Sequence, residues 1–98
     1  MLFAFICKDK PDHLQLRLDV RPDHVAYLKD LNAAGTLKFA GPFLDDHGNP
    51  CGSLVVIDAA DKPAAAAIAA GDPYAKAGLF AAVEIQPWNW VFNNPANG

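Results

Sequence analysis

The chain starts with a continuous apolar run, Leu2-Phe3-Ala4-Phe5-Ile6-Cys7, which limits the fold more than any other segment. Side chains of a strand point alternately to opposite faces, so Phe3 and Phe5 lie on one face and the even-numbered residues on the other. Both faces are apolar, and this predicts a strand that is covered on both sides. Other elements must therefore pack against both faces of this strand.

The remaining segments predict the element order βαββαβ. Residues 8–19 are mixed in character and predict a loop that leads into a short helical turn. The later segments carry clearer signals, which we interpret in chain order as a helix from Pro22 to a stop at Gly35, a strand over 36–44 that breaks near Gly41-Pro42, a turn over 45–50, a strand over 51–57, a helix over 61–71, a connector over 72–78 and a strand over 79–85.

This order is that of the split βαβ, or ferredoxin-like, α+β fold: a four-stranded antiparallel sheet with both helices on one face. The helices cover one face only, whereas the first strand needs cover on two. The chain has 98 residues, 52% of them hydrophobic and 19% charged, so a second copy of the chain is the simplest second cover. We expect one domain over residues 1–98 that forms a homodimer. Its tail over 89–98, with Trp90 and Phe92, is expected to pack on its own body or on the partner.

Charge and composition exclude several classes of partner. The net charge is −3 and the eight Lys and Arg residues are scattered, which argues against nucleic acid and against anionic membrane surfaces. No apolar run approaches the roughly 20 residues of a membrane span. The first run is not preceded by basic residues as in a signal peptide, so we expect a cytoplasmic protein with Cys7 and Cys51 reduced.

His24 is the candidate base. Pro22 suits the first turn of a helix, and this places His24 in that turn, on the same stripe as Leu28 and Leu31. The positive end of the helix dipole disfavours a charged imidazole, as a neutral base requires. The alternative interpretation is a partly buried histidine with a structural role.

Other side chains are candidates for binding a substrate. Arg21 is suited to a bidentate pair with a carboxylate, or is a solvated neighbour of Asp19. A strand that breaks at Gly41 and Pro42 would free backbone N–H groups for an anionic oxygen, or be a simple bulge. Tyr74 would close a pocket, or serve in aromatic packing.

Sequence motifs for other chemistries are missing. Ser53 has no G-x-S-x-G context, so it is not expected to be a nucleophile. The Asp45-Asp46-His47 turn lacks the spacing of a metal site, and we predict no metal. No G-x-G-x-x-G, P-loop or thiolate cluster occurs, so cofactor-free chemistry is the simplest assumption.

A set of short motifs in a fixed order resembles the YciI-like (YCII-related) family over the chain up to Trp88. The motifs are Arg21-Pro22-Asp23-His24 leading to Tyr27-Leu28, Gly35-Thr36-Leu37, Ala40-Gly41-Pro42, Gly52-Ser53-Leu54, Asp72-Pro73-Tyr74, Ala77-Gly78-Leu79 and Ile85 through Trp88. The resemblance implies a dimeric α+β barrel, in which the sheets of two ferredoxin-like domains face each other. It also implies a His–Asp pair in a cleft, carried by His24 and Asp72.

The expected function is a small cofactor-free enzyme that transfers a proton on a small organic molecule, in an isomerisation or an elimination. In it, Asp72 orients His24, since a carboxylate that accepts from one ring nitrogen makes the other a better base. The superfamily that the resemblance implies includes muconolactone isomerases, which points to an intermediate of aromatic degradation. A non-catalytic dimeric module that binds a small ligand is the alternative, with Asp72 merely capping the turn at Pro73.

Overall fold

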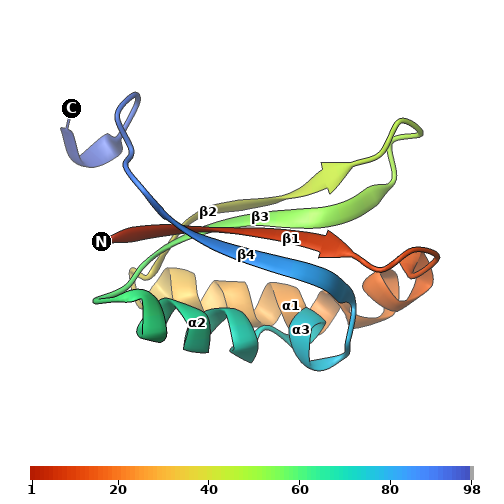
Figure 1. Ribbon diagram of the computed structural model, residues 1–98. Helices are drawn as coiled ribbons and strands as arrows, with labels where there is room; N and C mark the ends of the chain where they lie inside the picture. The colour runs from red at the N-terminus through yellow and green to blue at the C-terminus, as the bar shows by residue number, and fades with distance from the viewer. Residues whose placement is uncertain (98) are drawn as a thin grey trace.

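A four-stranded antiparallel sheet lies on a layer of helices in the computed structural model, which describes residues 1–97 (Figure 1). The elements in chain order are β1 (Leu2–Asp9), α1 (Leu14–Ala33), β2 (Leu37–Leu44), β3 (Pro50–Asp58), α2 (Lys62–Gly71), α3 (Pro73–Lys76), β4 (Phe80–Trp88) and a final 3-10 turn, η1 (Pro95–Asn97).

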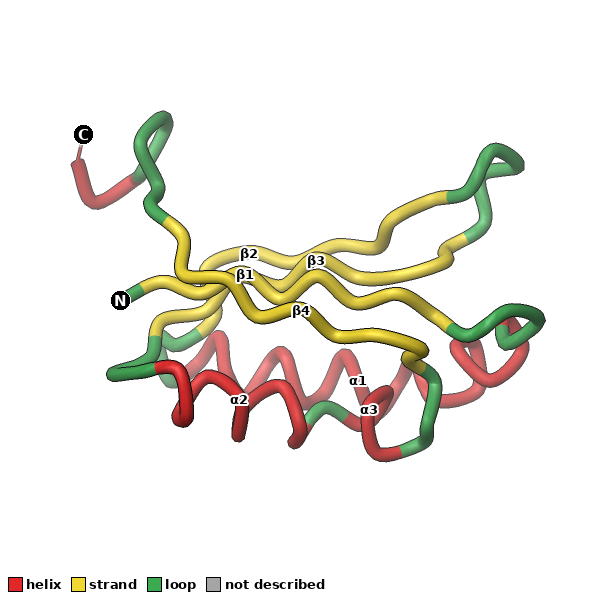
Figure 2. Tube along the Cα trace, viewed as in Figure 1, coloured by secondary structure: helices red, strands yellow, loops and turns green. Residues whose placement is uncertain are grey.

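The strand order in the sheet is β2-β3-β1-β4. β1 is central and pairs antiparallel with both β3 and β4, while β2 and β4 form the edges. All three α-helices lie on the same face of the sheet (Figure 2). The predicted ferredoxin-like βαββαβ fold is therefore confirmed, with one addition: the connector after α2 contains the short helix α3.

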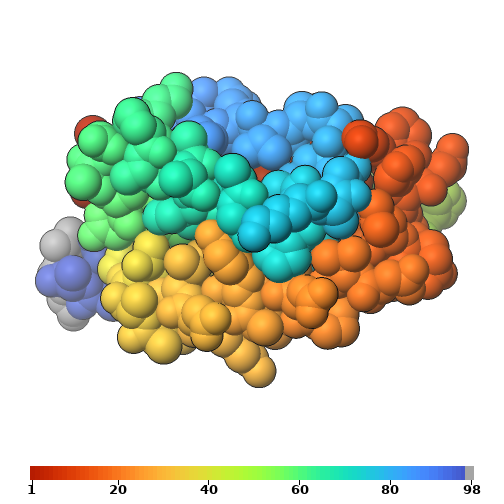
Figure 3. All heavy atoms as spheres, turned by 90° about the horizontal axis from the view of Figure 1, so that it is seen from below, coloured from red at the N-terminus to blue at the C-terminus, as the bar shows by residue number. Residues whose placement is uncertain are grey.

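The core forms between the sheet and the helices, and it includes the face of β1 that carries Phe3 and Phe5. Phe3 and Phe5 are 1% and 3% exposed, and they pack with Val55, Ile57 and Ala65. Seen from the helix side, α1 and the pair α2 and α3 form two bands of atoms that together cover this face (Figure 3). Ala65 belongs to α2, whose small side chains let the helix lie close to the strands.

The opposite face of the sheet carries apolar side chains and no helix. Phe39 contacts Trp88 edge to face with ring centroids 5.6 Å apart, and Trp90 of the tail contacts the same Phe39 at 4.9 Å. The tail thus packs in part on its own body, while Phe92 is 82% exposed. The β2–β3 hairpin and the tail rise above this face at its two ends (Figure 1). The last residue of the predicted tail, number 98, lies outside the described residues.

The prediction that the first helix begins at Pro22 was wrong. Helix α1 begins at Leu14, and Pro22 lies inside it. His13 at its N-cap position makes no side-chain capping bond, so the usual N-cap residue types do not mark this start. A proline inside a helix removes one backbone hydrogen bond, and tertiary contacts of the preceding turns, above all those of Arg17, compensate for that loss.

Two strands run through prolines where we expected them to end. β2 continues through Gly41-Pro42 to Leu44, and β4 continues through Pro87 to Trp88. Both are edge strands, where a missing N–H can face solvent without loss of a ladder bond. The strand break that we predicted at Gly41-Pro42 is therefore absent.

Gly52 marks a close approach of two strands. A Cβ atom at this position would collide with the backbone carbonyl oxygen of Cys7 in the neighbouring strand and crowd Phe43. Gly52→Ala is expected to lower the free energy of unfolding by about 1–3 kcal/mol, because the strands must move apart. Urea denaturation would measure this. Gly41→Ala is the matched control, since a Cβ atom there meets nothing within 4 Å, and an equal loss in both variants would contradict the steric argument.

Candidate functional site

A cavity of about 260 Å³ lies between α1 and the β2 and β3 strands, with α3 closing one end. Helix α1 contributes Arg21 and His24 to its wall, β2 contributes Gly41 and Pro42, and α3 contributes Tyr74. These five residues, which the sequence marked as candidates, border the same space. Asp72 lies behind His24, where it contacts the imidazole.

His24 and Asp72 form a buried pair. The imidazole Nδ1 donates to Asp72 Oδ1 at 2.8 Å and lies 3.0 Å from Oδ2, and the two residues are 8% and 7% exposed. Because a carboxylate only accepts, this contact fixes the proton of the neutral ring on Nδ1. Nε2 is left as the ring's acceptor, which is the arrangement of a general base.

Asp72 also caps a helix, in addition to its contact with His24. It lies between α2 and α3, and its Oδ1 accepts from the backbone N–H of Tyr74 at 2.9 Å. Pro73 follows at the first position of α3, and Asp72 itself has an extended backbone, as a residue before proline prefers. The same oxygen therefore orients the imidazole and starts the helix that carries Tyr74.

The position of His24 in its helix differs from our prediction. It lies well inside α1 rather than in the first turn, so the dipole at the helix N-terminus does not act on the ring. Two contacts orient the imidazole instead. One is the Asp72 carboxylate; the other is the Tyr74 ring, which stacks on His24 with centroids 3.9 Å apart and planes inclined by 16°.

Sequence reasoning missed Arg17, which is 4% exposed and also borders the cavity. Its Nε and Nη2 donate to the two carboxylate oxygens of Asp9 at 2.6 and 2.9 Å, and Nη2 also donates to Ser53 Oγ at 2.9 Å. Burial by itself would lower the pKa of Arg17, but the Asp9 carboxylate outweighs it and the pKa rises above its usual value. Arg17 is thus a fixed positive charge.

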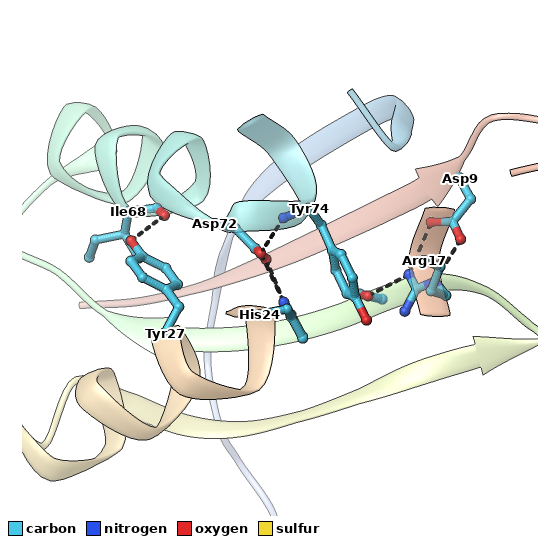
Figure 4. A network of polar contacts seen from close by, with 8 residues as sticks. Asp9, Arg17, His24, Tyr27, Ile68, Asp72 and Tyr74 are labelled. Carbon is cyan, nitrogen blue, oxygen red and sulfur yellow. Dashed lines mark hydrogen bonds and ion pairs between the residues drawn. The ribbon is translucent and has the colours of Figure 1, made fainter. Parts of the chain in front are cut away.

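The Tyr74 ring lies between the His24–Asp72 pair and the Arg17–Asp9 ion pair (Figure 4). The guanidinium carbon of Arg17 is 4.6 Å from the Tyr74 ring centroid, and His24 stacks on the same ring. Burial raises the pKa of Tyr74, and the charges of Arg17 and Arg21 oppose part of that rise. The phenol therefore keeps its proton at neutral pH.

Tyr27 serves the packing of two helices rather than the cavity. Its hydroxyl donates to the carbonyl oxygen of Ile68 at 2.8 Å, which ties α1 to α2. Gly71 leaves room for this hydroxyl, since a Cβ atom there would meet the oxygen at 2.5 Å. This contact keeps the helix of His24 next to the segment that carries Asp72.

The continuity of β2 changes the role that we predicted for Gly41 and Pro42. Gly41 pairs with Leu54 and Pro42 with Ser53 in the β2–β3 ladder, so no strand break frees backbone N–H groups for an anion. The two residues instead form a wall of the cavity opposite α1. Arg21, by contrast, is exposed.

The two cysteines differ in their surroundings. Cys7 is buried and Cys51 is exposed, and both are free thiols. Burial, with a contribution from the Asp72 charge, raises the pKa of Cys7 to about 12, so it carries almost no reactive thiolate at neutral pH. A maleimide reagent is expected to label one thiol per native chain and two in denaturant. Rapid native labelling of a Cys51→Ser variant would contradict this assignment.

Within residues 1–97, His, Cys, Asp and Glu side chains form no group of three or more that could hold a metal ion. None of the helices in this range is long and apolar enough to cross a membrane.

Comparisons with known proteins agree with this fold. The model of the YCII-related domain family matches residues 1–89. The YciI proteins of Escherichia coli O6:H1 and Shigella flexneri are each 39% identical over 98 residues, which is 94% of this chain and 100% of theirs. A solved structure of 5-chloro-2-hydroxyhydroquinone dehydrochlorinase (TftG) from Burkholderia phenoliruptrix AC1100, in complex with 2,5-dihydroxybenzoquinone, has a TM-score of 0.83 and 34% identity. The match covers 96% of this chain and 99% of that one.

Proposed function

This chain belongs to the YCII-related domain family, and from that premise we propose that it is a small-molecule enzyme in which His24 and Asp72 transfer a proton. The observation that carries the proposal is the buried contact of 2.8 Å between His24 Nδ1 and Asp72, on the wall of a cavity. A base that is held in one tautomer and faces a cavity has the geometry that proton abstraction requires.

The proposed reaction is an elimination or an isomerisation. His24 Nε2 accepts a proton from the substrate, and the imidazolium that forms is stabilised by the Asp72 carboxylate. In an elimination, the electron pair left behind expels a leaving group such as halide, and the proton passes from His24 to solvent. In an isomerisation, His24 returns the proton to another carbon of the same molecule. Neither route needs an added oxidant or reductant, and we assign no cofactor.

The substrate class follows from the cavity and from the structural neighbour. A volume of about 260 Å³ with mostly apolar walls suits a single-ring compound. TftG is a dehydrochlorinase crystallised with a dihydroxybenzoquinone. We propose a hydroxylated ring compound of aromatic degradation, bordered by Arg21, Gly41, Pro42 and Tyr74.

The first test uses the substrate of the structural neighbour. Purified protein is incubated under nitrogen with 5-chloro-2-hydroxyhydroquinone, and released chloride and quinone absorbance are followed. Chloride release that depends on the protein supports an elimination. The assay is then extended to non-halogenated ring lactones as isomerisation substrates. Saturable binding without turnover of any of these compounds would instead favour the alternative, a module that binds a small ligand.

We also propose that two copies of the chain pack through the helix-free face of the sheet. Phe39, Trp88 and Trp90 form an aromatic cluster on this face, and such a patch on a small domain favours a partner. Sedimentation equilibrium would give twice the chain mass. Phe39→Asp is expected to shift the equilibrium to monomer, and a monomeric wild type would reject the proposal.

A further inference from the structure

Two arginines reach the wall of the cavity although the chain as a whole is acidic. Two arginines, Arg17 and Arg21, border it together with His24 and Tyr74, and none of the described residues that line it is an aspartate or a glutamate. The formal net charge of the chain is −3, so the excess of basic over acidic side chains belongs to the lining of this cavity and not to the chain as a whole. Asp9 and Asp72 lie behind Arg17 and His24, so a ligand in the cavity meets hydrogen-bond donors and cationic groups, while neither carboxylate is part of the lining.

Arg17 already uses several of its N–H donors within the chain. Asp9 occupies the Nε and Nη2 edge of Arg17, one of the two edges with which a guanidinium clamps a carboxylate. Ser53 takes a further bond from Nη2. Nε and Nη2 of Arg17 are therefore occupied by its own chain, and its positive charge lies beside Tyr74.

Tyr74 is the group that Arg17 positions. Its ring is held from one side by His24 at 3.9 Å and lies under the Arg17 guanidinium at 4.6 Å, so it has little freedom to rotate. Its backbone N–H is fixed to Asp72 at 2.9 Å. A buried phenol beside a cation is a single, well-aimed hydrogen-bond donor, and this suits one anionic oxygen better than a two-oxygen carboxylate.

We propose that Arg17 is a positioning residue that holds the Tyr74 hydroxyl as donor to a single anionic oxygen, so that the site takes rings with an ionised hydroxyl, a phenolate or an enolate. This inference rests on the proposed function and names its substrate class. When His24 Nε2 takes the proton of a ring hydroxyl, the O–H electron pair stays on that oxygen, which is then the anionic oxygen that accepts the Tyr74 hydrogen bond. Tyr74 keeps its own proton throughout.

A matched pair of probes tests the preference for a phenolate. 4-Nitrophenol ionises and its phenolate absorbs at longer wavelength, whereas 4-nitroanisole has the same ring without an ionisable oxygen. The wild type is expected to bind the phenolate roughly tenfold to a hundredfold more tightly than the anisole, because a hydrogen bond to a charged group is worth about 1.5–3 kcal/mol. The absorbance titration should show the pKa of the bound phenol lowered.

Tyr74→Phe removes the donor and keeps the ring. It is expected to lose the phenolate preference while the affinity for 4-nitroanisole stays unchanged. Tyr27→Phe is the matched control, because its hydroxyl serves Ile68 and not the cavity, and the preference should remain. Equal affinity of the wild type for both probes, no binding of the phenolate, or full preference in Tyr74→Phe would each overturn the proposal.

Arg17 is tested with its ion-pair partner, so that no charge is left buried alone. The Asp9→Asn/Arg17→Gln double variant should move the pKa of bound 4-nitrophenol back toward its value in solution and leave the affinity for 4-nitroanisole unchanged. Ser53→Ala, which removes one Arg17 contact and keeps the ion pair, should give a smaller change in the same direction. It also decides the question if the double variant does not fold. An unchanged pKa in the variants that fold would overturn the role of Arg17.

The binding assay contains no turnover, so its outcome is independent of the proposed proton transfer. A retained phenolate preference in a protein without any turnover would reject the enzyme proposal alone. Turnover without phenolate preference would reject the role of Tyr74 and Arg17 alone.

Discussion

His24→Ala is expected to lower kcat by a factor of about 10² to 10⁴ on whichever ring compound the wild type converts, with little change in KM. A positioned general base contributes about this much to a proton transfer. The side chain borders the cavity and is held by Asp72, so its removal takes away the proton acceptor and leaves the apolar walls that bind the ring. Steady-state kinetics of both proteins measure the two constants separately.

Asp72→Asn is the companion variant. An asparagine keeps the size of the side chain and leaves its amide oxygen able to cap α3, but it removes the charge that stabilises the imidazolium. We expect a loss of kcat of similar order. His13→Ala is the control, since His13 is a half-buried histidine that contacts the Pro11 carbonyl and does not line the cavity. If His24→Ala retained wild-type kcat, the chemistry would not run through this imidazole.

Arg17→Met is expected to cause the largest loss of stability, about 3–5 kcal/mol, because it leaves the Asp9 carboxylate buried without a partner. Asp9 is 6% exposed and both its oxygens accept from Arg17. A domain of this size has a total stability of about 5–15 kcal/mol. The melting temperature should fall by more than about 10 °C, and thermal unfolding followed by circular dichroism would measure it.

The Asp9→Leu/Arg17→Met double variant separates the charge from the packing. Replacing both partners of a buried ion pair by apolar residues is often neutral, so the double variant should regain most of the stability that Arg17→Met loses. Arg21→Met, at an exposed arginine of the same helix, should change the stability by less than about 0.5 kcal/mol. A double variant as unstable as the single one would show that the lost packing of Arg17, rather than the stranded carboxylate, matters most.

The sequence contained enough to predict the sheet and the candidate pair. Strand geometry predicted that Phe3 and Phe5 share one face of β1, and the structure shows this face in the core. Gly35, just after α1, has the positive φ of 77° that its role as a helix stop requires. The pairing of His24 with Asp72 came from the family resemblance, because no local pattern links two residues that are 48 positions apart.

The start of α1 and the role of Arg17 could not be predicted for a shared reason. Residues around Leu14 carry no cap or period, and what holds that turn is the ion pair from Arg17 to Asp9 and its bond to Ser53, which is 36 positions away. Such contacts exist only once the sheet has formed. A proline at the start of a helix and a proline that long-range contacts make tolerable inside a helix look the same in the sequence, which is why the prediction of a start at Pro22 was wrong.

Two parts of the molecule line the cavity, and they differ in how firmly they are packed. His24, Arg17 and Tyr74 come from the helices and are bound to the core, whereas the opposite wall comes largely from the β2–β3 hairpin, where Gly41 is exposed and has open space beside it. Substitutions in the hairpin can therefore reshape the cavity while His24, Arg17 and Tyr74 stay in place. If the proposed proton transfer holds, a few residues of a single edge hairpin are enough to change which substrate the cavity accepts.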